Sequence, residues 1–121
     1  MCFQIERTSR LCFSAEYSSF SVGPETDKYR LSVAGYSGDA GDAIGAPALP
    51  VLINNGMMFS TPDQDNDLLP AKCFPGIDVG GWWFNKCGRA ILNRDDNGIW
   101  DAFTASYIFD VQSSRMLVKL D

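Results

Sequence analysis

The residues whose types and spacing predict chemistry lie between positions 54 and 87. The run DQDND at 63–67 puts a side-chain oxygen on five consecutive residues, and Cys73 and Cys87 bracket thirteen residues shortly after it. Carboxylate and amide oxygens at this density suit a hard cation. The stretch has too little apolar periodicity to predict a regular helix or strand. It therefore predicts an irregular lobe held by a cation and a disulfide.

Calcium is the cation that this run suits best, because it takes about six to eight oxygen ligands from carboxylates, carbonyls and water. The run is not an EF-hand, which needs Gly at the sixth loop position and Glu at the twelfth. Counting from Asp63, those positions hold Leu68 and Phe74, and the register that starts at Asp65 fails at both positions as well. A solvated acidic turn would show the same run, so the residues alone leave both interpretations open.

The composition excludes several classes of function. The chain has 121 residues, 45% of them hydrophobic and 21% charged, which is ordinary for one globular domain or part of one. Its net charge is −5 and it has no histidine, so we expect no nucleic-acid partner. No apolar run approaches the roughly 20 residues that span a bilayer. A zinc site is not expected either, because the four cysteines include no Cys-x-x-Cys pair.

An enzyme is not expected. The carboxylates that suit acid–base pairs are Asp39, Asp42, Asp95 and Asp96, and they lie in turns that contain Gly or Asn. Asp is favoured in such turns for local hydrogen bonding. The sequence offers no histidine, nucleophile motif or phosphate loop to work with them.

The cysteines and the N-terminus give opposite indications of cellular location. Four cysteines suit an oxidising compartment, whereas the opening MCFQIERTSR has no hydrophobic signal core. We resolve the conflict by expecting a secreted protein of which this chain is a part. Cys2 and Cys12 fall on the first two expected strands, where they could be free buried thiols or a pair with each other, and we favour free thiols.

An antiparallel sheet is expected to position the lobe. Apolar alternation predicts strands at 3–7, 11–22, 28–34, 99–103, 106–111 and 116–120. Residues 37–44 could form at most a short helix capped by Ser37 or Asp39, and 46–53 is a packed loop or a poorly ordered insertion. Loops, turns and short helical pieces are expected from 54 to 96. The fold class is α+β, with a small, mostly antiparallel sheet and an irregular calcium-binding lobe.

Three motifs are specific enough to indicate a family. They are AEYSSFSVGPETDKYRLSVAGYSGDAGDA, NNGMMFSTPDQDND and GGWWFNKCG, in this order along the chain. The chain resembles the fibrinogen C-terminal domain, the globular module of fibrinogen chains, ficolins, tenascins, angiopoietins and invertebrate fibrinogen-related lectins. The resemblance covers only the second half of that module. It implies a partial domain over 1–121, with a sheet part at 1–53 and a calcium- and ligand-binding lobe at 54–121.

The resemblance implies a ligand set for Ca²⁺. Two Asp side chains followed by two main-chain carbonyls form the calcium loop of the family. On this chain they correspond to the side chains of Asp65 and Asp67 and the carbonyls of Leu69 and Ala71, with Asp63 outside the coordination shell.

The family also implies the disulfide Cys73–Cys87. Closing a loop of this size is worth about 3 kcal/mol in the chain-entropy model. Trp82 and Trp83 lie just before Cys87 and could stack on a sugar, but large aromatics usually fill a core. We expect at least one of them to be core.

A ligand pocket beside the calcium loop is the third implication. It takes an acetyl group in family lectins and a peptide amino terminus in fibrinogen. On this chain it would involve Asp78, Lys86, Cys87 and Gly88, with a cis peptide between Lys86 and Cys87. Gly88 stands where lectins have a histidine, as in the angiopoietins, which bind a protein receptor. Two further departures are the inserted segment near 46–53 and the loss of most of a tyrosine-bearing loop after Cys87.

The expected function is a secreted, calcium-stabilised recognition module with lectin-like binding of carbohydrate or acetylated surface groups in innate immune recognition. The alternative is a protein-ligand or receptor-binding module of the angiopoietin or tenascin type. An inactive, truncated half-module is a third reading. In each active reading we expect the full-length parent to be an oligomer.

Overall fold

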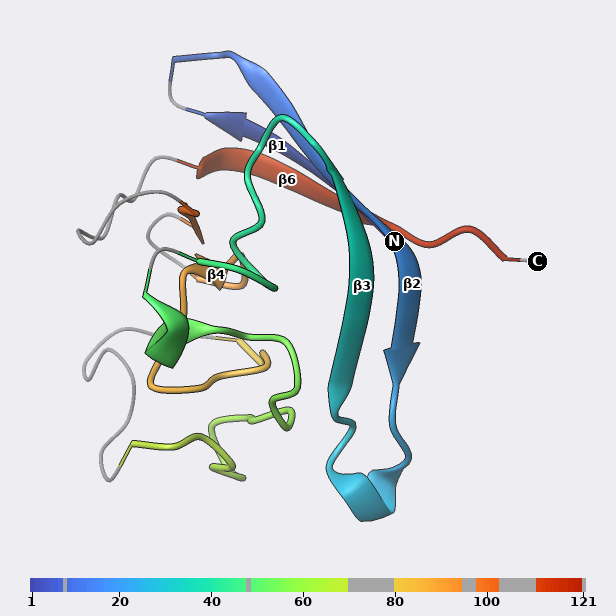
Figure 1. Cartoon of the computed structure of the whole chain (residues 1–121). Coiled ribbons are helices and arrows are strands. Elements are labelled where there is room, and N and C mark those ends of the chain that lie inside the picture. The colour runs from blue at the N-terminus through green and yellow to red at the C-terminus, as the bar shows by residue number, and fades with distance from the viewer. Residues whose placement is uncertain (8, 48, 70–79, 95–97, 103–110, 121) are drawn as a thin grey trace.

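A four-stranded antiparallel sheet lies along one side of the molecule and a loop-rich lobe packs against it (Figure 1). The structure is a computed structural model, described for all residues except 8, 48, 70–79, 95–97, 103–110 and 121. The strand order in the sheet is β3-β2-β1-β6. The bounds are β1 Cys2–Arg7, β2 Cys12–Val22, β3 Leu31–Gly38 and β6 Val111–Leu117.

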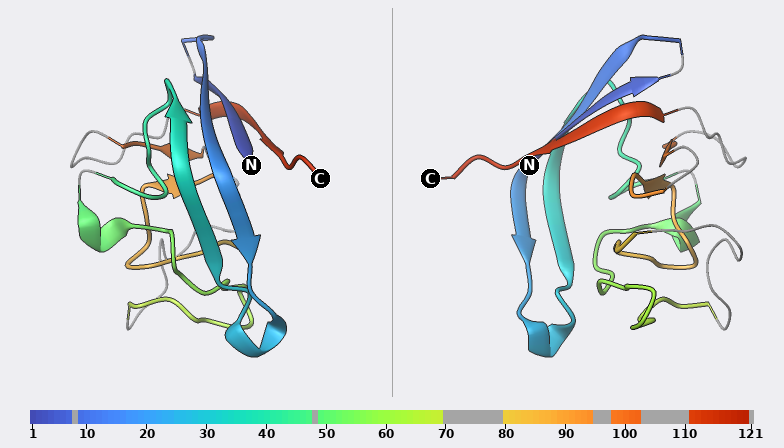
Figure 2. Two further views of the ribbon diagram at one scale, coloured as in Figure 1. Left: turned by 45° about the vertical axis from the view of Figure 1, so that its right-hand side comes forward. Right: turned by 180° about the vertical axis from the view of Figure 1, so that it is seen from behind.

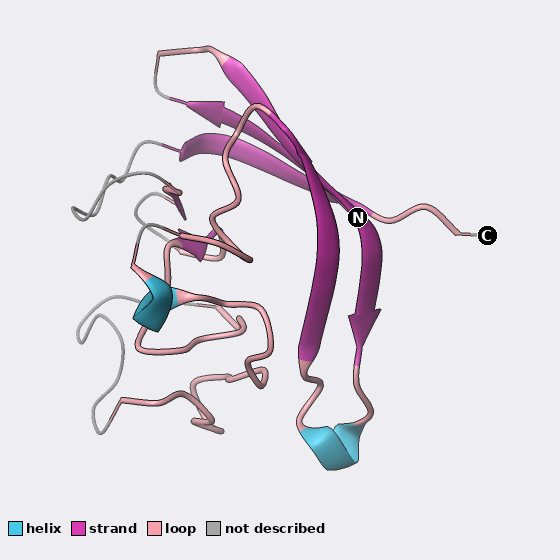
Figure 3. Ribbon diagram, in the orientation of Figure 1, coloured by secondary structure: helices cyan, strands magenta, loops and turns pink. Residues whose placement is uncertain are grey.

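The lobe contains little regular structure. Its second sheet has two short strands, β4 (Ala90–Ile91) and β5 (Ile99–Trp100). The helical pieces of the described chain are 3₁₀ turns, η1 (Glu25–Asp27) between β2 and β3 and η2 (Pro50–Leu52) in the lobe (Figure 3). The mostly antiparallel sheet is confirmed, whereas the α+β label is not, because the described residues contain no α-helix. Neither helical piece of the described chain is long enough to span a lipid bilayer.

The first hairpin follows the predicted alternation. Phe3 and Ile5 of β1 are buried, and they lie opposite Ala15 and Phe13 of β2. A tight turn joins the two strands, in which the Arg10 N–H donates to the Arg7 carbonyl over 2.8 Å. The predicted strands at 3–7 and 11–22 are confirmed.

The third strand starts later and ends later than predicted. Lys28 and Tyr29 both have φ of 54°, a left-handed conformation that ends the turn and cannot continue into a strand. The strand then runs through Gly38, and the rest of the segment 37–44, for which at most a short helix was expected, contains none. Gly35, with φ of 71°, interrupts the strand between the buried residues at its start and the half-buried Tyr36.

The C-terminal strand belongs to the sheet and not to the lobe. Strand β6 pairs antiparallel with β1, and Met116 lies opposite Phe3. The predicted boundary that assigned all of 54–121 to the lobe is therefore wrong for β6, since pairing between distant segments leaves no local signal. The strand ends at Leu117, short of the predicted 120. Most of the strand predicted at 106–111 lies outside the described residues.

The core lies between the sheet and the lobe, whose ribbons Figure 2 shows from two further sides. The large side chains that form it from the sheet are Phe3, Ile5, Tyr17, Leu31 and Val33. Those from the lobe are Ile44, Trp82, Phe84, Ile91, Ile99 and Trp100. Burial of each such side chain contributes about 1.5–3 kcal/mol. Apolar packing therefore stabilises the lobe as well as the sheet.

The inserted segment near 46–53 is packed at Pro47 and Leu52, whereas Val51 is 59% exposed. Its 3₁₀ turn η2 buries Leu52, and the chain continues directly into the Asn54–Asn55 pair. Asn55 fastens the lobe to β3, because its Oδ1 accepts the Val33 N–H over 2.9 Å and its Nδ2 donates to the Val33 carbonyl over 3.0 Å. The Asn55 side chain thus makes the two hydrogen bonds at Val33 that the main chain of a neighbouring strand would otherwise make. A packed loop was one of the two predicted states of this segment.

Candidate functional site

The acidic loop, defined here as residues 63–69, brings Asp65 and Asp67 together. The Asp67 N–H donates to Asp65 Oδ1 over 3.0 Å, and the Leu69 N–H donates to Asp67 Oδ1 over 2.8 Å. Partial burial raises the pKa of Asp67, and the neighbouring Asp65 carboxylate adds to the rise. Two carboxylates in this position repel each other, and a bound cation would remove the repulsion.

Asp63 has a different role in the acidic loop. Its carboxylate accepts a hydrogen bond from the Thr61 hydroxyl over 2.7 Å, and this bond lowers the pKa of Asp63. The loop is fastened by Asn66, whose main-chain N–H donates to Ser60 Oγ over 2.9 Å and whose Nδ2 donates to the Phe59 carbonyl over 2.8 Å. Asn66 therefore anchors the loop between the two candidate calcium carboxylates.

The residues present fit a calcium ion. The paired carboxylates of Asp65 and Asp67 supply hard oxygen ligands, and the carbonyl of Leu69 follows two residues later. Ala71, the fourth predicted ligand, lies outside the described residues. The described part of the chain contains no cluster of three or more acidic, Cys or His side chains. An ion on this loop would therefore complete its shell with main-chain carbonyls and water.

The 85–88 turn, Asn85 to Gly88, carries the other predicted ligand-binding residues. Asn85 is 5% exposed, and its N–H donates to the Cys87 carbonyl over 3.0 Å. The prediction of a cis peptide at Lys86–Cys87 is wrong, since no peptide bond in the described chain is cis. The turn is made instead by the left-handed conformation of Cys87, whose φ is 67°. Lys86 is exposed on it.

Cys87 is disulfide-bonded. Cys2 and Cys12 are free, as expected. The predicted partner Cys73 lies outside the described residues, so the Cys73–Cys87 pairing stays a prediction. Asp78, predicted at the rim of the pocket, lies outside them as well.

Gly88 closes the 85–88 turn against a buried amide. A Cβ on Gly88 would lie 2.3 Å from Asn54 Nδ2, and Gly88 has φ of 149°. Asn54 is itself fully buried and fixed, because its Nδ2 donates to the Trp83 carbonyl over 2.8 Å and its Oδ1 accepts the Ala90 N–H over 3.3 Å. The position therefore has no room for a side chain.

The acidic loop and the 85–88 turn are in direct contact. The Leu68 N–H donates to the Asn85 carbonyl over 3.1 Å. The structure thus brings together Asp65, Asp67 and Leu69 on one side and the turn on the other, two segments that the sequence separates by fifteen residues, 70–84.

The two tryptophans that precede the 85–88 turn donate hydrogen bonds to main-chain carbonyls of other segments. Trp82 is 1% exposed and donates its indole N–H to the Ala90 carbonyl, so the prediction that at least one tryptophan is core is confirmed. Trp83 is half-buried and donates to the Tyr29 carbonyl over 2.9 Å. The two rings meet edge to face, with centroids 5.4 Å apart.

The carboxylates considered for catalysis have structural partners. Asp39 accepts the Ser14 N–H over 2.8 Å, which fastens the chain after β3 to β2. Asp42 Oδ1 accepts the Tyr17 hydroxyl over 2.6 Å. Burial raises the pKa of Tyr17, and the hydrogen bond to Asp42 raises it further. The remaining candidates, at 95–96, lie outside the described residues.

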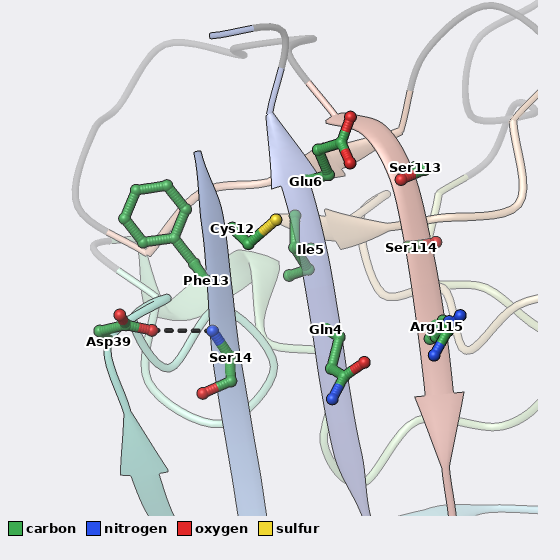
Figure 4. A pocket seen from close by; sticks show the side chains of 10 residues that line it. All are labelled: Gln4, Ile5, Glu6, Cys12, Phe13, Ser14, Asp39, Ser113, Ser114 and Arg115. Carbon is green, nitrogen blue, oxygen red and sulfur yellow. Dashed lines mark hydrogen bonds between the residues drawn. The ribbon is translucent and has the colours of Figure 1, made fainter. Parts of the chain in front are cut away.

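Among the described residues, two cavities lie on the four-stranded sheet. One, of about 500 Å³, is lined by residues of β1, β2 and β6 that include Gln4, Cys12 and Arg115 (Figure 4). The other, of about 560 Å³, includes Cys2 and Leu117. Neither is lined by any residue of the acidic loop or the 85–88 turn.

The residues that hold the site in place were not predicted from the sequence. Asn54 and Asn85 are both buried amides that bond main-chain groups of other segments. Arg89 and Asp101 form a buried ion pair at 3.8 Å. An amide flanked by large apolar residues, as in WWFNKC, was the available signal, because a buried Asn requires hydrogen-bond partners.

Comparison with known proteins places this arrangement in a family. The family model described as "Fibrinogen beta and gamma chains, C-terminal globular domain" matches residues 1–116. The chain is 42% identical over 108 residues to the protein scabrous of Drosophila melanogaster, covering 87% of this chain and 12% of that protein. It is 46% identical over 88 residues to the human fibrinogen gamma chain, covering 66% of this chain and 19% of that protein.

Solved structures show the same fold. The fibrinogen-like globe domain of human ANGPTL2 superimposes with a TM-score of 0.73 at 29% identity, covering 93% of this chain and 54% of that one. A lamprey fibrin D-dimer, complexed with the peptide ligand Gly-His-Arg-Pro-amide, superimposes with a TM-score of 0.79 at 26% identity, covering 98% and 46%. The chain thus spans about half of these solved relatives and less than a quarter of the curated ones. It belongs to the family of the fibrinogen C-terminal globular domain.

Proposed function

We propose that this chain is the calcium-stabilised part of an extracellular recognition module, and that it binds a protein or peptide ligand at the 85–88 turn. The fibrinogen C-terminal domain is a binding module and not an enzyme, so a ligand-binding role follows from membership in the family. The disulfide at Cys87 supports an extracellular location, because disulfides persist in oxidising compartments.

The observation that carries the choice of ligand is Gly88. Lectins of the family have a histidine at this position, but here Asn54 lies where the Cβ of any side chain would be. Residue 88 therefore supplies no side chain to line an acetyl pocket, and the exposed Lys86 beside it places a positive charge on the turn. The curated relatives include angiopoietin-4 of Bos taurus, 38% identical over 116 residues, and one solved relative holds a peptide ligand.

The second candidate is lectin-like binding of carbohydrate or acetylated surface groups in innate immune recognition. One observation favours it. The acidic loop touches the 85–88 turn through the Leu68–Asn85 hydrogen bond, and lectins of the family place the acetyl pocket beside their calcium loop. In both candidates the calcium site is formed by Asp65, Asp67 and the Leu69 carbonyl, with Ala71 as a further ligand.

Calcium binding is tested by thermal unfolding in EGTA, magnesium and millimolar calcium. A ligand that binds only the folded state stabilises it by RT ln(1 + [L]/Kd), so calcium is expected to raise the melting temperature. The double variant Asp65→Asn, Asp67→Asn is expected to lose that rise and to be no less stable in EGTA, because it removes the repulsion. A flat response of the wild-type protein to calcium would contradict the calcium site.

Ligand class is tested with two probes in calcium. We expect labelled Gly-His-Arg-Pro-amide to bind in fluorescence anisotropy and N-acetylated resin to retain no protein. Because this peptide is cationic and has no carboxylate, Lys86→Glu should strengthen its binding by replacing a like charge with an opposite one. The matched change Lys119→Glu, at an exposed lysine outside the site, should leave binding unchanged, and neither variant should change the melting temperature. Retention on the resin with elution by N-acetylglucosamine would select the second candidate. Binding to neither probe would contradict the assignment of the turn as this type of ligand site.

A further inference from the structure

Asn85 is the residue at which three segments of the lobe meet. Its main-chain carbonyl accepts the Leu68 N–H of the acidic loop over 3.1 Å. Its Nδ2 donates to the carbonyl of Ile53, at the end of the inserted segment, over 2.9 Å. Its Oδ1 accepts the Lys86 N–H over 2.8 Å, inside the 85–88 turn. At 5% exposure the side chain has almost no water to replace these partners.

These bonds fix the direction of the Asn85 carbonyl. The amide is held at both ends, by Ile53 on one side and by Lys86 on the other, and a buried amide that loses either partner bears a desolvation cost. With the side chain fixed, the main-chain carbonyl stays aimed at the Leu68 N–H. Replacing the side chain of Asn85 is therefore expected to change the geometry of the acidic loop, although this side chain makes its hydrogen bonds to Ile53 and Lys86 and not to the loop.

Leu68 is the residue through which the loop would respond. It lies between Asp67, whose side chain is a candidate calcium ligand, and Leu69, whose carbonyl is another. The bond from Leu68 to Asn85 thus ties the peptide between two ligands to the turn. An ion bound to the Asp67 side chain and the Leu69 carbonyl would restrain the Leu68 peptide between them, and with it the Leu68–Asn85 hydrogen bond.

We propose that Asn85 is a positioning residue that couples calcium binding on the acidic loop to the conformation of the 85–88 turn. This inference rests on the proposed function, since it takes the calcium site as given. Coupling between two binding sites is reciprocal, so a ligand on the turn also tightens calcium. In this chain the inserted segment takes part, because Ile53 supplies the carbonyl that orients Asn85.

The variant test compares Asn85→Ala with Asn93→Ala by calorimetric calcium titration and by melting in EGTA and in calcium. Asn93 Nδ2 also donates to a main-chain carbonyl, that of Gly81 over 2.9 Å, but outside the contact between loop and turn. We expect Asn85→Ala to weaken calcium binding about fivefold or more and to reduce the calcium-induced rise in melting temperature. Asn93→Ala should bind calcium as the wild type does. If Asn85 only stabilised the fold, Asn85→Ala would lower the melting temperature equally in EGTA and in calcium. The calcium-induced rise would then be the same as in the wild-type protein.

Hydrogen exchange on the wild-type protein tests the same coupling without a variant. Calcium is expected to slow exchange at the amides of Leu68, Lys86 and Gly88, not only within the acidic loop. Protection confined to the acidic loop, or equal calcium affinity in Asn85→Ala, would overturn the coupling and leave the calcium site standing. A wild-type protein that binds no calcium in the titration would overturn the calcium site itself, and the coupling with it.

Discussion

Alkaline pH should destabilise this domain through a single buried tyrosine. The Tyr17 hydroxyl lies in the core, 3% exposed, and donates to Asp42 Oδ1 over 2.6 Å. Burial raises its pKa above the ordinary value of 10.0, and the hydrogen bond to Asp42 adds to the rise. The folded protein therefore keeps the phenol proton at a pH at which the unfolded chain releases it. Stability from this group is complete below pH 10 and is lost as the pH rises above it.

The magnitude follows from the linkage relation. One pH unit above the unfolded pKa, the unfolded chain gains about 1.4 kcal/mol from releasing the proton that the folded protein retains. Tyr17→Phe removes the hydrogen bond, which costs about 1.5 kcal/mol at pH 8, but it also removes the titration. The stability advantage of the wild-type protein over Tyr17→Phe is thus expected to shrink from about 1.5 kcal/mol at pH 8 to near zero at pH 11.

The assay is urea unfolding at pH 8, 9, 10 and 11, followed by tryptophan fluorescence. Trp82 and Trp100 are buried and report on the same core. Tyr29→Phe, at a ring that is 46% exposed, controls for the loss of a phenol hydroxyl at pH 8. A difference between wild type and Tyr17→Phe that stays constant from pH 8 to 11 would refute the reasoning.

Three further substitutions test the packing around the site. Asn55→Ala should lower the free energy of unfolding by about 2 kcal/mol in urea, because two hydrogen bonds to Val33 are lost; a loss under 0.5 kcal/mol would show that the side chain does not fasten the lobe. Trp82→Ala should cost about 3–5 kcal/mol in the same assay, and a milder effect would place the indole outside the core. Gly88→Ala should cost about 2 kcal/mol or more, since the new methyl group meets Asn54 and the backbone is left-handed. A melting temperature within one degree of the wild type would contradict that contact.

The alternation of apolar and polar residues correctly predicted the first hairpin, whose two strands depend on local sequence pattern. The first hairpin has buried Phe3 and Ile5 facing the core, and both strands lie where the period-two pattern placed them. The late start of β3 could not be predicted, because nothing in the types of Lys28 and Tyr29 indicates a left-handed backbone. Glycine usually takes that conformation, and here two non-glycine residues do.

Contacts between segments that lie far apart in the chain could not be predicted from the sequence. The sheet membership of β6 depends on pairing with β1, more than one hundred residues away, and the β4–β5 pair is only two residues long in each strand. Short pieces of this kind have too few residues to show a period. The core of the lobe was underestimated for the same reason, since its buried residues come from scattered loops.

The candidate site was predicted in part. Types and spacing identified the acidic run at 63–67, and the resemblance to the family selected Asp65 and Asp67 within it. The structure places the carboxylates of these two residues together. The left-handed turn at Cys87 and the role of Asn85 were not foreseen, since one is a backbone conformation and the other depends on Ile53 and Leu68 from elsewhere in the chain. Sequence motifs locate ligands more readily than they locate the groups that orient them.

The amide of Asn55 has one more effect on the sheet. It caps the outer side of β3 at Val33, and main-chain bonds between Leu31 and the Gly56–Met57 segment cap it further along. Strand β6 ends the sheet at the opposite side. The two edges of the sheet, β3 and β6, therefore differ in how readily a further strand can pair with them. Among the described residues, the outer edge of β6 is bonded at Val111, by Gly98, and the outer edge of β3 is bonded at Leu31 and Val33. Additional polypeptide that joins the hydrogen-bond ladder therefore meets fewer occupied positions at β6 than at β3.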